Sequence, residues 1–558
     1  MLFYKGLKQA AQWGANFVPS ELRQAIKNRL KAELKDELKG ELKDELKGEL
    51  KDELKDELKD ELKDELMSKL CEFIPEAIQR QFDLTGKVTD FKRYVEDEFL
   101  SMRGENDKAS LVERLSSEWR AFVRESAGLS VEVTPTPSLK DLHQELSFLR
   151  INQKIFSPVF QLLAHKRVLF SGQAYYNAWY LSRALRDNGW KADLLNWNTQ
   201  ADVQIYFHGE DFRFYGDLTN ELEVNLSFYL SSIYLYDIFH FSNEQAICFG
   251  WPVQGFFKER YGKYSEIFLL KGLGKKIVYT NNGCLDGVSQ TAFSKWGPES
   301  VCSICRWRNE PSVCSDERNL EWGKFRNSVA DYQCLLGGNR VDYNDAPTVH
   351  EVPEFYCLDK DIWHPQIQIP DKFLLPVKPE GTVWLYHAVG HKSERTDEDG
   401  INIKSSHVYL PLVEKLKKQG YQVELLEPTG IPNMEVRFLQ VQADIFLDML
   451  TFGWFGANVR EAMMLGKPVI CYIRPEWLES LRKEIPEYAD DLPIISATPY
   501  TVEAVLCDLI VNPEKRREIG ERSRQFALKW HSAEAGGRRL SSIYEGLLKG
   551  DPQLLVKS

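Results

Sequence analysis

The chain lacks any long uninterrupted apolar segment. No stretch of about 18 apolar residues, the length needed to cross a bilayer, occurs among its 558 residues. The longest candidate, residues 224–241, is interrupted by Asn225, Ser227, Asp237 and His240. The opening residues also lack a continuous apolar core. The sequence therefore predicts neither a membrane-spanning helix nor a secretory signal.

An excess of positive charge and a regular set of cysteines are also missing. The formal net charge is −12 at pH 7, and half of it comes from a repeat at residues 35–66. A nucleic-acid partner favours a basic face, so none is expected. Ten unevenly spaced cysteines favour a reducing cytoplasm over a disulfide scaffold. We therefore expect a cytoplasmic protein, and the length implies two or three domains.

The N-terminal region is dominated by the repeat. Residues 35–66 are tandem tetrapeptides, six Lys-Asp-Glu-Leu and two Lys-Gly-Glu-Leu, built mainly of strong helix formers. Leucine recurs every fourth residue and a helix turns about 100° per residue, so the leucine stripe winds around the helix instead of forming a heptad seam. Both a passive spacer and an arm for self-association or tethering fit this pattern.

Helical segments flank the repeat. Residues 1–34 are predicted to be a weakly amphipathic helical segment, which either docks on the next helix or makes a peripheral contact with a membrane surface. Residues 67–152 predict further helices and a linker at Pro135–Ser138. Residues 1–152 together are thus expected to form an N-terminal helical extension.

Alternating strands and helices follow this extension. Residues 153–376 predict a Rossmann-like domain with a first strand at Arg167–Phe170, a tight turn at Gly172 and a helix over Asn177–Asn188. Alternating elements continue over residues 192–195, 203–208, 233–240, 246–249 and 276–280. Residues 377–548 predict a second domain of this kind, with a strand at 383–387, a helix at 406–419, a strand at 421–425 and a helix at 436–442. The predicted fold class is α/β, with two doubly wound domains.

The most informative segment runs over residues 443–474. A short apolar strand, Ile445–Leu447, precedes a turn containing Gly453 and Gly456 and a helix over Asn458–Leu465. A helix that begins at a glycine turn presents unpaired N–H groups and a positive dipole end, which suit a phosphate. Glu461 lies about one turn into this helix, where a carboxylate can reach a ribose hydroxyl. The segment therefore predicts half of a nucleotide-binding site.

This segment resembles the C-terminal domain of retaining glycosyltransferases with the GT-B fold, the glycogen-synthase-like family. The matching residues are Gly453–Gly456 for a Gly-Phe-Gly-like turn, Glu461–Met463 for a Glu-Ala-Met helix and Gly466–Val469 for Gly-Lys-Pro-Val. The family usually has two glutamates eight positions apart. Glu461 matches the second, whereas Gly453 replaces the first, which normally contacts the donor sugar.

The resemblance implies two Rossmann-like domains facing a cleft. It also implies transfer of a sugar from a nucleotide-diphosphate-sugar donor to a glycan, a lipid-linked or a protein acceptor, with no cofactor required for transfer. The residues that it places in catalysis are His240, Arg395, Lys404 and Glu461. The residues that it places around the donor or facing the cleft are Gly172, His387, Gly390, Ser406, Gly456, Ala457, Asn458 and Arg460.

Several of these roles follow from charge. Lys404 and Arg395, with Lys392 as a rival for the second position, would neutralise the departing diphosphate. Arg460 would be an added cation that partly compensates for the missing first glutamate. His240 ends a segment that resembles the family's Asp-x-x-His strand end, near the transfer site; a histidine in the core with a hydrogen-bond partner fits the sequence equally well.

A cluster of cysteines interrupts the first domain. Cys284, Cys302, Cys305 and Cys314 include one C-x-x-C pair, whose spacing places two thiolates on one metal. A structural zinc site, buried unpaired thiols and a redox pair all remain compatible with this pattern. A catalytic zinc is not expected, because the cluster contains no suitably spaced histidine.

Two other functional classes remain open. A nucleotide-sugar 2-epimerase shares this fold and would turn over the nucleotide-sugar without an acceptor. A non-catalytic binding or assembly protein is motivated by Gly453 in place of the first glutamate, and would use the repeat as its active part. Deleting the N-terminal 70 residues would separate a transferase, which should keep its activity, from an assembly protein, which should lose its partner.

Overall fold

The computed structural model describes most of the chain after the predicted extension. It covers residues 166–551 except for gaps at 173–174, 199–205, 215–221, 244, 282, 285, 296–299, 336–339, 378 and 391. The extension, including the repeat, and the start of the first predicted domain lie outside these residues. In the part that is described, no helix has both the length and the apolar character needed to cross a bilayer.

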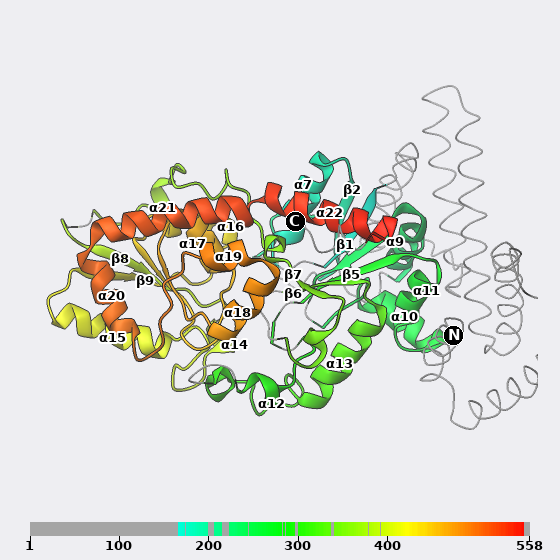
Figure 1. Cartoon of the computed structure of the whole chain (residues 1–558), viewed down its shortest axis with the longest axis horizontal. Helices are drawn as coiled ribbons and strands as arrows, with labels where there is room; N and C mark the ends of the chain where they lie inside the picture. Colours follow the sequence, from blue (N-terminus) through cyan, green and yellow to red (C-terminus); the bar gives the residue numbers. More distant parts are fainter. Residues whose placement is uncertain are drawn as a thin grey trace, which may run out of the picture. The chain divides into compact units, whose positions relative to one another are not determined.

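The first domain is built on a seven-stranded parallel sheet in the order β3-β2-β1-β4-β5-β6-β7. Figure 1 labels β1, β2, β5, β6 and β7 of this sheet. The strands are β1 (Arg167–Ser171), β2 (Lys191–Asn196), β3 (Phe212–Arg213), β4 (Ile238–Phe241), β5 (Lys276–Thr280), β6 (Tyr332–Leu335) and β7 (Val349–Glu351). The first six positions follow the Rossmann order, with a reversal between β1 and β4. The strands are almost wholly buried because helices cover a parallel sheet.

Helices connect these strands. They are α7 (Asn177–Asp187), α9 (Leu222–Leu235), α10 (Trp251–Tyr261), α11 (Ser265–Gly272), α12 (Gln290–Phe293) and α13 (Asp316–Val329). The predicted first strand, glycine turn and helix are all present, with Gly172 at a φ of +79°. This left-handed backbone favours glycine.

Some predicted elements of the first domain were wrong. Residues 206–208 form a turn and coil rather than a strand, and residues 246–249 form neither a helix nor a strand. Ile233 belongs to the end of α9, and the strand begins only at Ile238. Helix α9 is apolar around most of its circumference, and hydrophobic periodicity cannot distinguish such a helix from a buried strand.

The second domain contains a four-stranded parallel sheet in the order β11-β10-β8-β9. Its strands are β8 (Val383–Tyr386), β9 (Val423–Leu426), β10 (Ile445–Leu447) and β11 (Val469–Ile470). Its helices are α14 (Lys392–Arg395), α15 (Ser406–Lys418), α16 (Asn433–Gln440), α17 (Ala457–Met464), α18 (Pro475–Glu484), α19 (Pro486–Asp491) and α20 (Val502–Val511). The predicted GT-B class is therefore present as two Rossmann-like parallel α/β units.

The C-terminal helices, red in Figure 1, join the two units. Helix α21 (Pro513–Trp530) packs on α17, whereas α22 (Ala533–Lys549) packs on α7 of the first domain. A Cβ atom on Gly537 would lie only 2.6 Å from the Cβ atom of Ala184, so glycine is required for this close approach. The crossing occurs at His531, whose carbonyl accepts a hydrogen bond from Leu358 N at 2.8 Å.

Candidate functional site

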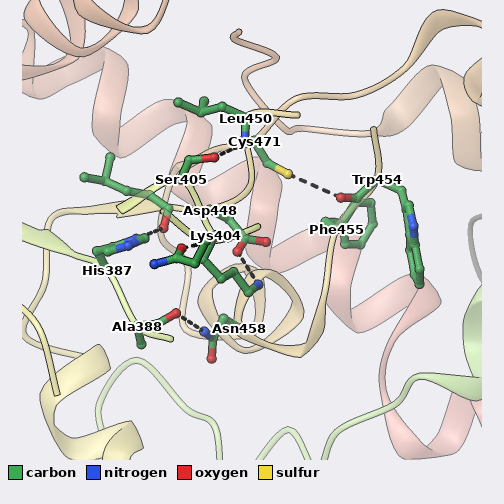
Figure 2. A network of polar contacts seen from close by, with 12 residues as sticks. His387, Ala388, Lys404, Ser405, Asp448, Leu450, Trp454, Phe455, Asn458 and Cys471 are labelled. Atoms are coloured by element: carbon green, nitrogen blue, oxygen red, sulfur yellow. Dashed lines mark hydrogen bonds and ion pairs between the residues drawn. The ribbon is translucent and has the colours of Figure 1, made fainter. Parts of the chain in front are cut away.

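Polar side chains gather where β8 and β10 end. His387 directly follows β8, Asp448 directly follows β10, and Lys404 to Ser406 lead into α15. Parallel strands bring their carboxyl ends to one edge of a sheet, which is where ligands bind in open α/β folds. Figure 2 shows His387, Lys404, Ser405 and Asp448 together with Asn458 of α17.

Lys404 and Asp448 form a buried ion pair at the centre of this group. Lys404 Nζ lies 2.5 Å from Asp448 Oδ1, and the two residues are 8% and 3% exposed. Asp448 Oδ2 is buried and has no hydrogen-bond partner among the residues that the structure describes. The Lys404 backbone is held by its N–H, which donates to Asn402 Oδ1 at 3.0 Å. The lysine therefore has a defined direction, set by a carboxylate from the neighbouring strand.

His387 is fixed by two hydrogen bonds. Its Nδ1 lies 3.1 Å from the carbonyl oxygen of Leu447, and its Nε2 lies 2.8 Å from Ser406 Oγ. A carbonyl oxygen only accepts, so Nδ1 carries the proton and Nε2 accepts from the serine hydroxyl. Burial lowers the pKa of His387, which keeps the ring neutral. The histidine thus supports the start of α15 and adds no positive charge to the site.

The glycine turn brings the start of α17 close to Lys404. Gly456 is the N-cap residue and makes no side-chain cap hydrogen bond. A Cβ atom at Gly456 would lie 3.4 Å from Lys404 Nζ. Asn458 Nδ2 donates to the carbonyl oxygen of Ala388 at 3.5 Å, which connects the helix to the loop after β8. The structure therefore brings together the predicted residues His387, Lys404, Ser406, Gly456, Ala457 and Asn458.

Glu461 lies in the same helix but is enclosed by protein. It is 0% exposed. Its Oε1 accepts from Tyr176 Oη at 2.8 Å and from Asn433 Nδ2 at 2.9 Å, and its Oε2 accepts from Gln440 Nε2 at 2.6 Å. The predicted ribose-binding carboxylate is thus the acceptor of a network that includes a tyrosine of the first domain.

Arg460 is buried against the glycine turn and an aromatic ring. Its Nη1 donates to the carbonyl oxygen of Phe455 at 3.3 Å, and its guanidinium lies 4.1 Å from the ring centroid of Tyr356. The side chain is buried, and burial lowers its pKa. Arg460 therefore contacts the glycine turn through Phe455, and it also lies against the ring of Tyr356.

The backbone explains why the first family glutamate is absent. Gly453 has a φ of +93°, a conformation that residues with a side chain rarely adopt. A Cβ atom there would also lie 3.0 Å from Arg474 Cβ. A glutamate at this position would therefore strain the turn.

The loop after β8 carries the remaining basic candidates. Lys392 Nζ lies 2.5 Å from Glu427 Oε1 in a half-exposed ion pair. Arg395 ends the short helix α14 and is half-buried. A Cβ atom on Gly390 would lie 2.6 Å from the Tyr206 hydroxyl, so this loop approaches the first domain. The rival lysine therefore has a carboxylate partner within its own domain.

The candidates in the first domain are packed into its interior. His240 is 0% exposed, with Nδ1 2.6 Å from Tyr544 Oη and Nε2 2.6 Å from Thr280 Oγ1. Burial lowers its pKa to about 3. This is the core position that the sequence allowed as an alternative to the transfer site. At Gly172 an added Cβ atom would lie 2.4 Å from the Asn243 side chain.

The four cysteines lie between β5 and α13. Each is partly buried; Cys302 lies within a short 3-10 helix (Val301–Ile304), and Cys305 directly follows it. Cys314 Sγ accepts from Gln290 Nε2 at 3.4 Å. Burial, with smaller contributions from Cys305 and Cys314, raises the pKa of Cys302 to about 11. Within the described residues, no group of three or more His, Cys, Asp or Glu is arranged to hold a metal ion.

Sequence reasoning missed several residues of this region. Asp448 had a usable signal, because a polar residue directly after a buried strand lies at the ligand-binding edge of a parallel sheet. Tyr176 and Gln440 had no such signal in the sequence. Their hydrogen bonds to Glu461 join residues that are 285 and 21 positions apart, respectively.

Comparisons with known proteins found remote similarity to solved structures. No protein-family model and no curated protein matches the chain. A sucrose-phosphate synthase from Thermosynechococcus elongatus is 14% identical, with 69% of this chain and 100% of that chain covered and a TM-score of 0.42. The catalytic domain of starch synthase IV from Arabidopsis thaliana, bound to ADP and acarbose, is 11% identical, with 69% and 99% covered and a TM-score of 0.40. HepE of Anabaena, in complex with UDP-glucose, is 10% identical, with 68% and 100% covered and a TM-score of 0.40.

Such remote similarity says nothing about the ligand of this chain. The class assignment comes from the chain itself, which has two Rossmann-like parallel sheets and a C-terminal helix that returns to the first of them. The protein therefore has a glycosyltransferase-like fold of the GT-B type.

Proposed function

We propose that this protein is a glycosyltransferase that uses a nucleotide-diphosphate-sugar donor. The observation that carries the proposal is the meeting of Lys404 with the start of α17 at the carboxyl edge of the second sheet. A buried lysine and a helix N-terminus without a side-chain cap are complementary to a diphosphate. Gly456 leaves room for a phosphate to approach the backbone.

The proposed reaction breaks the bond between the anomeric carbon and a diphosphate oxygen. The nucleoside diphosphate leaves with the bonding electrons, and an acceptor oxygen forms the new bond while its proton passes to the departing diphosphate or to solvent. Lys404 and the helix dipole offset the charge that develops on the leaving group, with Arg395 proposed as the second cation. The family resemblance supports retention of the anomeric configuration.

Asp448 is proposed to position Lys404. The pair is buried, so an unpaired charge would be costly there, and the carboxylate fixes the lysine before the donor arrives. A diphosphate bound beside Lys404 would share its ammonium group with Asp448, because an ammonium has three donors.

Titration calorimetry with UDP and ADP tests nucleotide binding directly. In a second experiment, the protein is incubated with UDP-glucose or ADP-glucose and the products are separated by chromatography. Transfer to an added glycan supports the proposal. A new nucleotide-sugar isomer formed without an acceptor would identify an epimerase instead. Absence of binding to a panel of nucleoside diphosphates and their sugars would favour the non-catalytic assembly protein.

A further inference from the structure

Glu461 connects the two domains through a fully oriented hydrogen-bond network. Tyr176 and His208 come from the first domain, and Asn433, Gln440 and Glu461 come from the second. The Glu461 carboxylate on α17 thus accepts hydrogen bonds from two residues of α16 and from Tyr176, the residue that precedes α7.

The direction of each hydrogen bond follows from its partners. His208 Nε2 lies 2.8 Å from Asn433 Oδ1, which only accepts, so Nε2 carries the proton. His208 Nδ1 therefore accepts from Tyr180 Oη at 2.8 Å. Burial lowers the pKa of His208 to about 4, which keeps it neutral. Asn433 then directs its amide group at Glu461.

Tyr176 is held firmly against Glu461. Its ring stacks on His208, with centroids 4.7 Å apart, and His208 stacks in turn on the buried Trp363 at 5.4 Å. Burial and the nearby carboxylate hold the pKa of Tyr176 well above its usual range. The phenol therefore stays protonated and donates to Glu461.

This hydroxyl has the chemistry of the ligand that Glu461 was predicted to bind. A ribose hydroxyl and a tyrosine hydroxyl are both neutral O–H donors to a carboxylate. We propose that Tyr176 is an interdomain latch, whose hydroxyl occupies Glu461 in place of a ribose hydroxyl and must give way when a nucleotide binds. This inference rests on the proposed nucleotide-sugar function, and it adds a regulatory contact to that site.

Glu461 tolerates the exchange because each of its oxygens keeps a donor within the same domain. Without Tyr176, Oε1 still accepts from Asn433 and Oε2 from Gln440. The latch can therefore open without leaving a buried carboxylate unpaired. The cost is the hydrogen bond of one hydroxyl, which the ribose replaces.

The test is the Tyr176→Phe variant, with Tyr180→Phe as the matched control. Tyr180 lies one turn further along α7, is equally buried and donates to His208 rather than to Glu461. Tyr176→Phe lacks the hydroxyl that is bound to the Glu461 carboxylate. Its affinity for UDP or ADP should be higher by roughly 10- to 100-fold, because in the wild type a closed latch reduces the fraction of molecules that can bind nucleotide. Tyr180→Phe should change the affinity by less than about threefold.

Hydrogen exchange of the wild-type protein provides a second measurement that needs no variant. Saturating UDP or ADP should lower the protection of amides around Tyr176, because its anchoring contact is lost. Nucleotide affinity unchanged in Tyr176→Phe, or protection at Tyr176 that rises with nucleotide, would overturn the latch and leave the proposed function intact. Failure of all three proteins to bind any nucleotide would instead overturn the proposed function, and the latch with it.

Discussion

Replacing Lys404 with methionine should affect stability and ligand binding through separate causes. The side chains of Lys404 and Asp448 are 11% and 4% exposed, so water can hardly solvate a carboxylate left behind. Breaking a buried ion pair from one side costs about 3–5 kcal/mol. We expect the free energy of unfolding of Lys404→Met to fall by about 3 kcal/mol in urea titrations. Loss of a charge-assisted hydrogen bond to phosphate should also weaken UDP or ADP binding by ~1–3 kcal/mol in calorimetry.

A second substitution separates these effects. Lys404→Met combined with Asp448→Asn removes both charges, so most of the stability should return while nucleotide binding stays weak. Lys392→Met is the matched control, because the Lys392–Glu427 pair is half-exposed and should contribute no more than about 1 kcal/mol. Wild-type nucleotide affinity in the double variant would refute the role of Lys404 as a phosphate ligand. A fully stable single variant would refute the argument from burial.

Three further predictions follow from the described residues. Gly453→Ala should destabilise the protein by about 1–3 kcal/mol, because φ is +93° and Arg474 lies close. Gly430 has a φ of +67°, and no atom of the described residues lies within 4 Å of an added Cβ atom there. Gly430→Ala should therefore show only a backbone cost in the same urea titrations, and equal effects of the two substitutions would argue against the contact with Arg474. Burial raises the pKa of Glu351 from 4.5 to about 8, so the wild type should lose stability as the pH rises through this range. Glu351→Gln should therefore gain stability relative to the wild type between pH 5 and pH 8, and a pH-independent difference would contradict this. If Cys284, Cys302, Cys305 and Cys314 all ligate zinc, the four thiols must come together and ionise. Metal analysis should then find about one zinc per chain, and a protein without zinc would argue against the site.

Local sequence predicted much of the second domain. Strand β10 has the bounds that were expected, and helix α15 begins at the expected residue, Ser406. Helix α17 begins at Ala457, one residue before the predicted start. Short apolar runs and glycine turns act over a few residues, so their consequences can be read without knowing the fold.

Prediction failed where local patterns were ambiguous. Helix α9 lacks a polar face, so its end at residues 233–235 could not be separated from the strand that follows. His240 carried equal sequence support for a core and a functional position, and only its contacts with Tyr544 and Thr280 place it in the core.

The sequence by itself determined the alternation of strands and helices, the glycine turn before α17 and the presence of a lysine ahead of α15. Only the tertiary structure decided which group each charged side chain meets. Lys404 meets Asp448 from 44 residues away, and Glu461 meets Tyr176 from 285 residues away. Such pairs leave no local periodic signal, because they form only when two sheets and their helices have packed together.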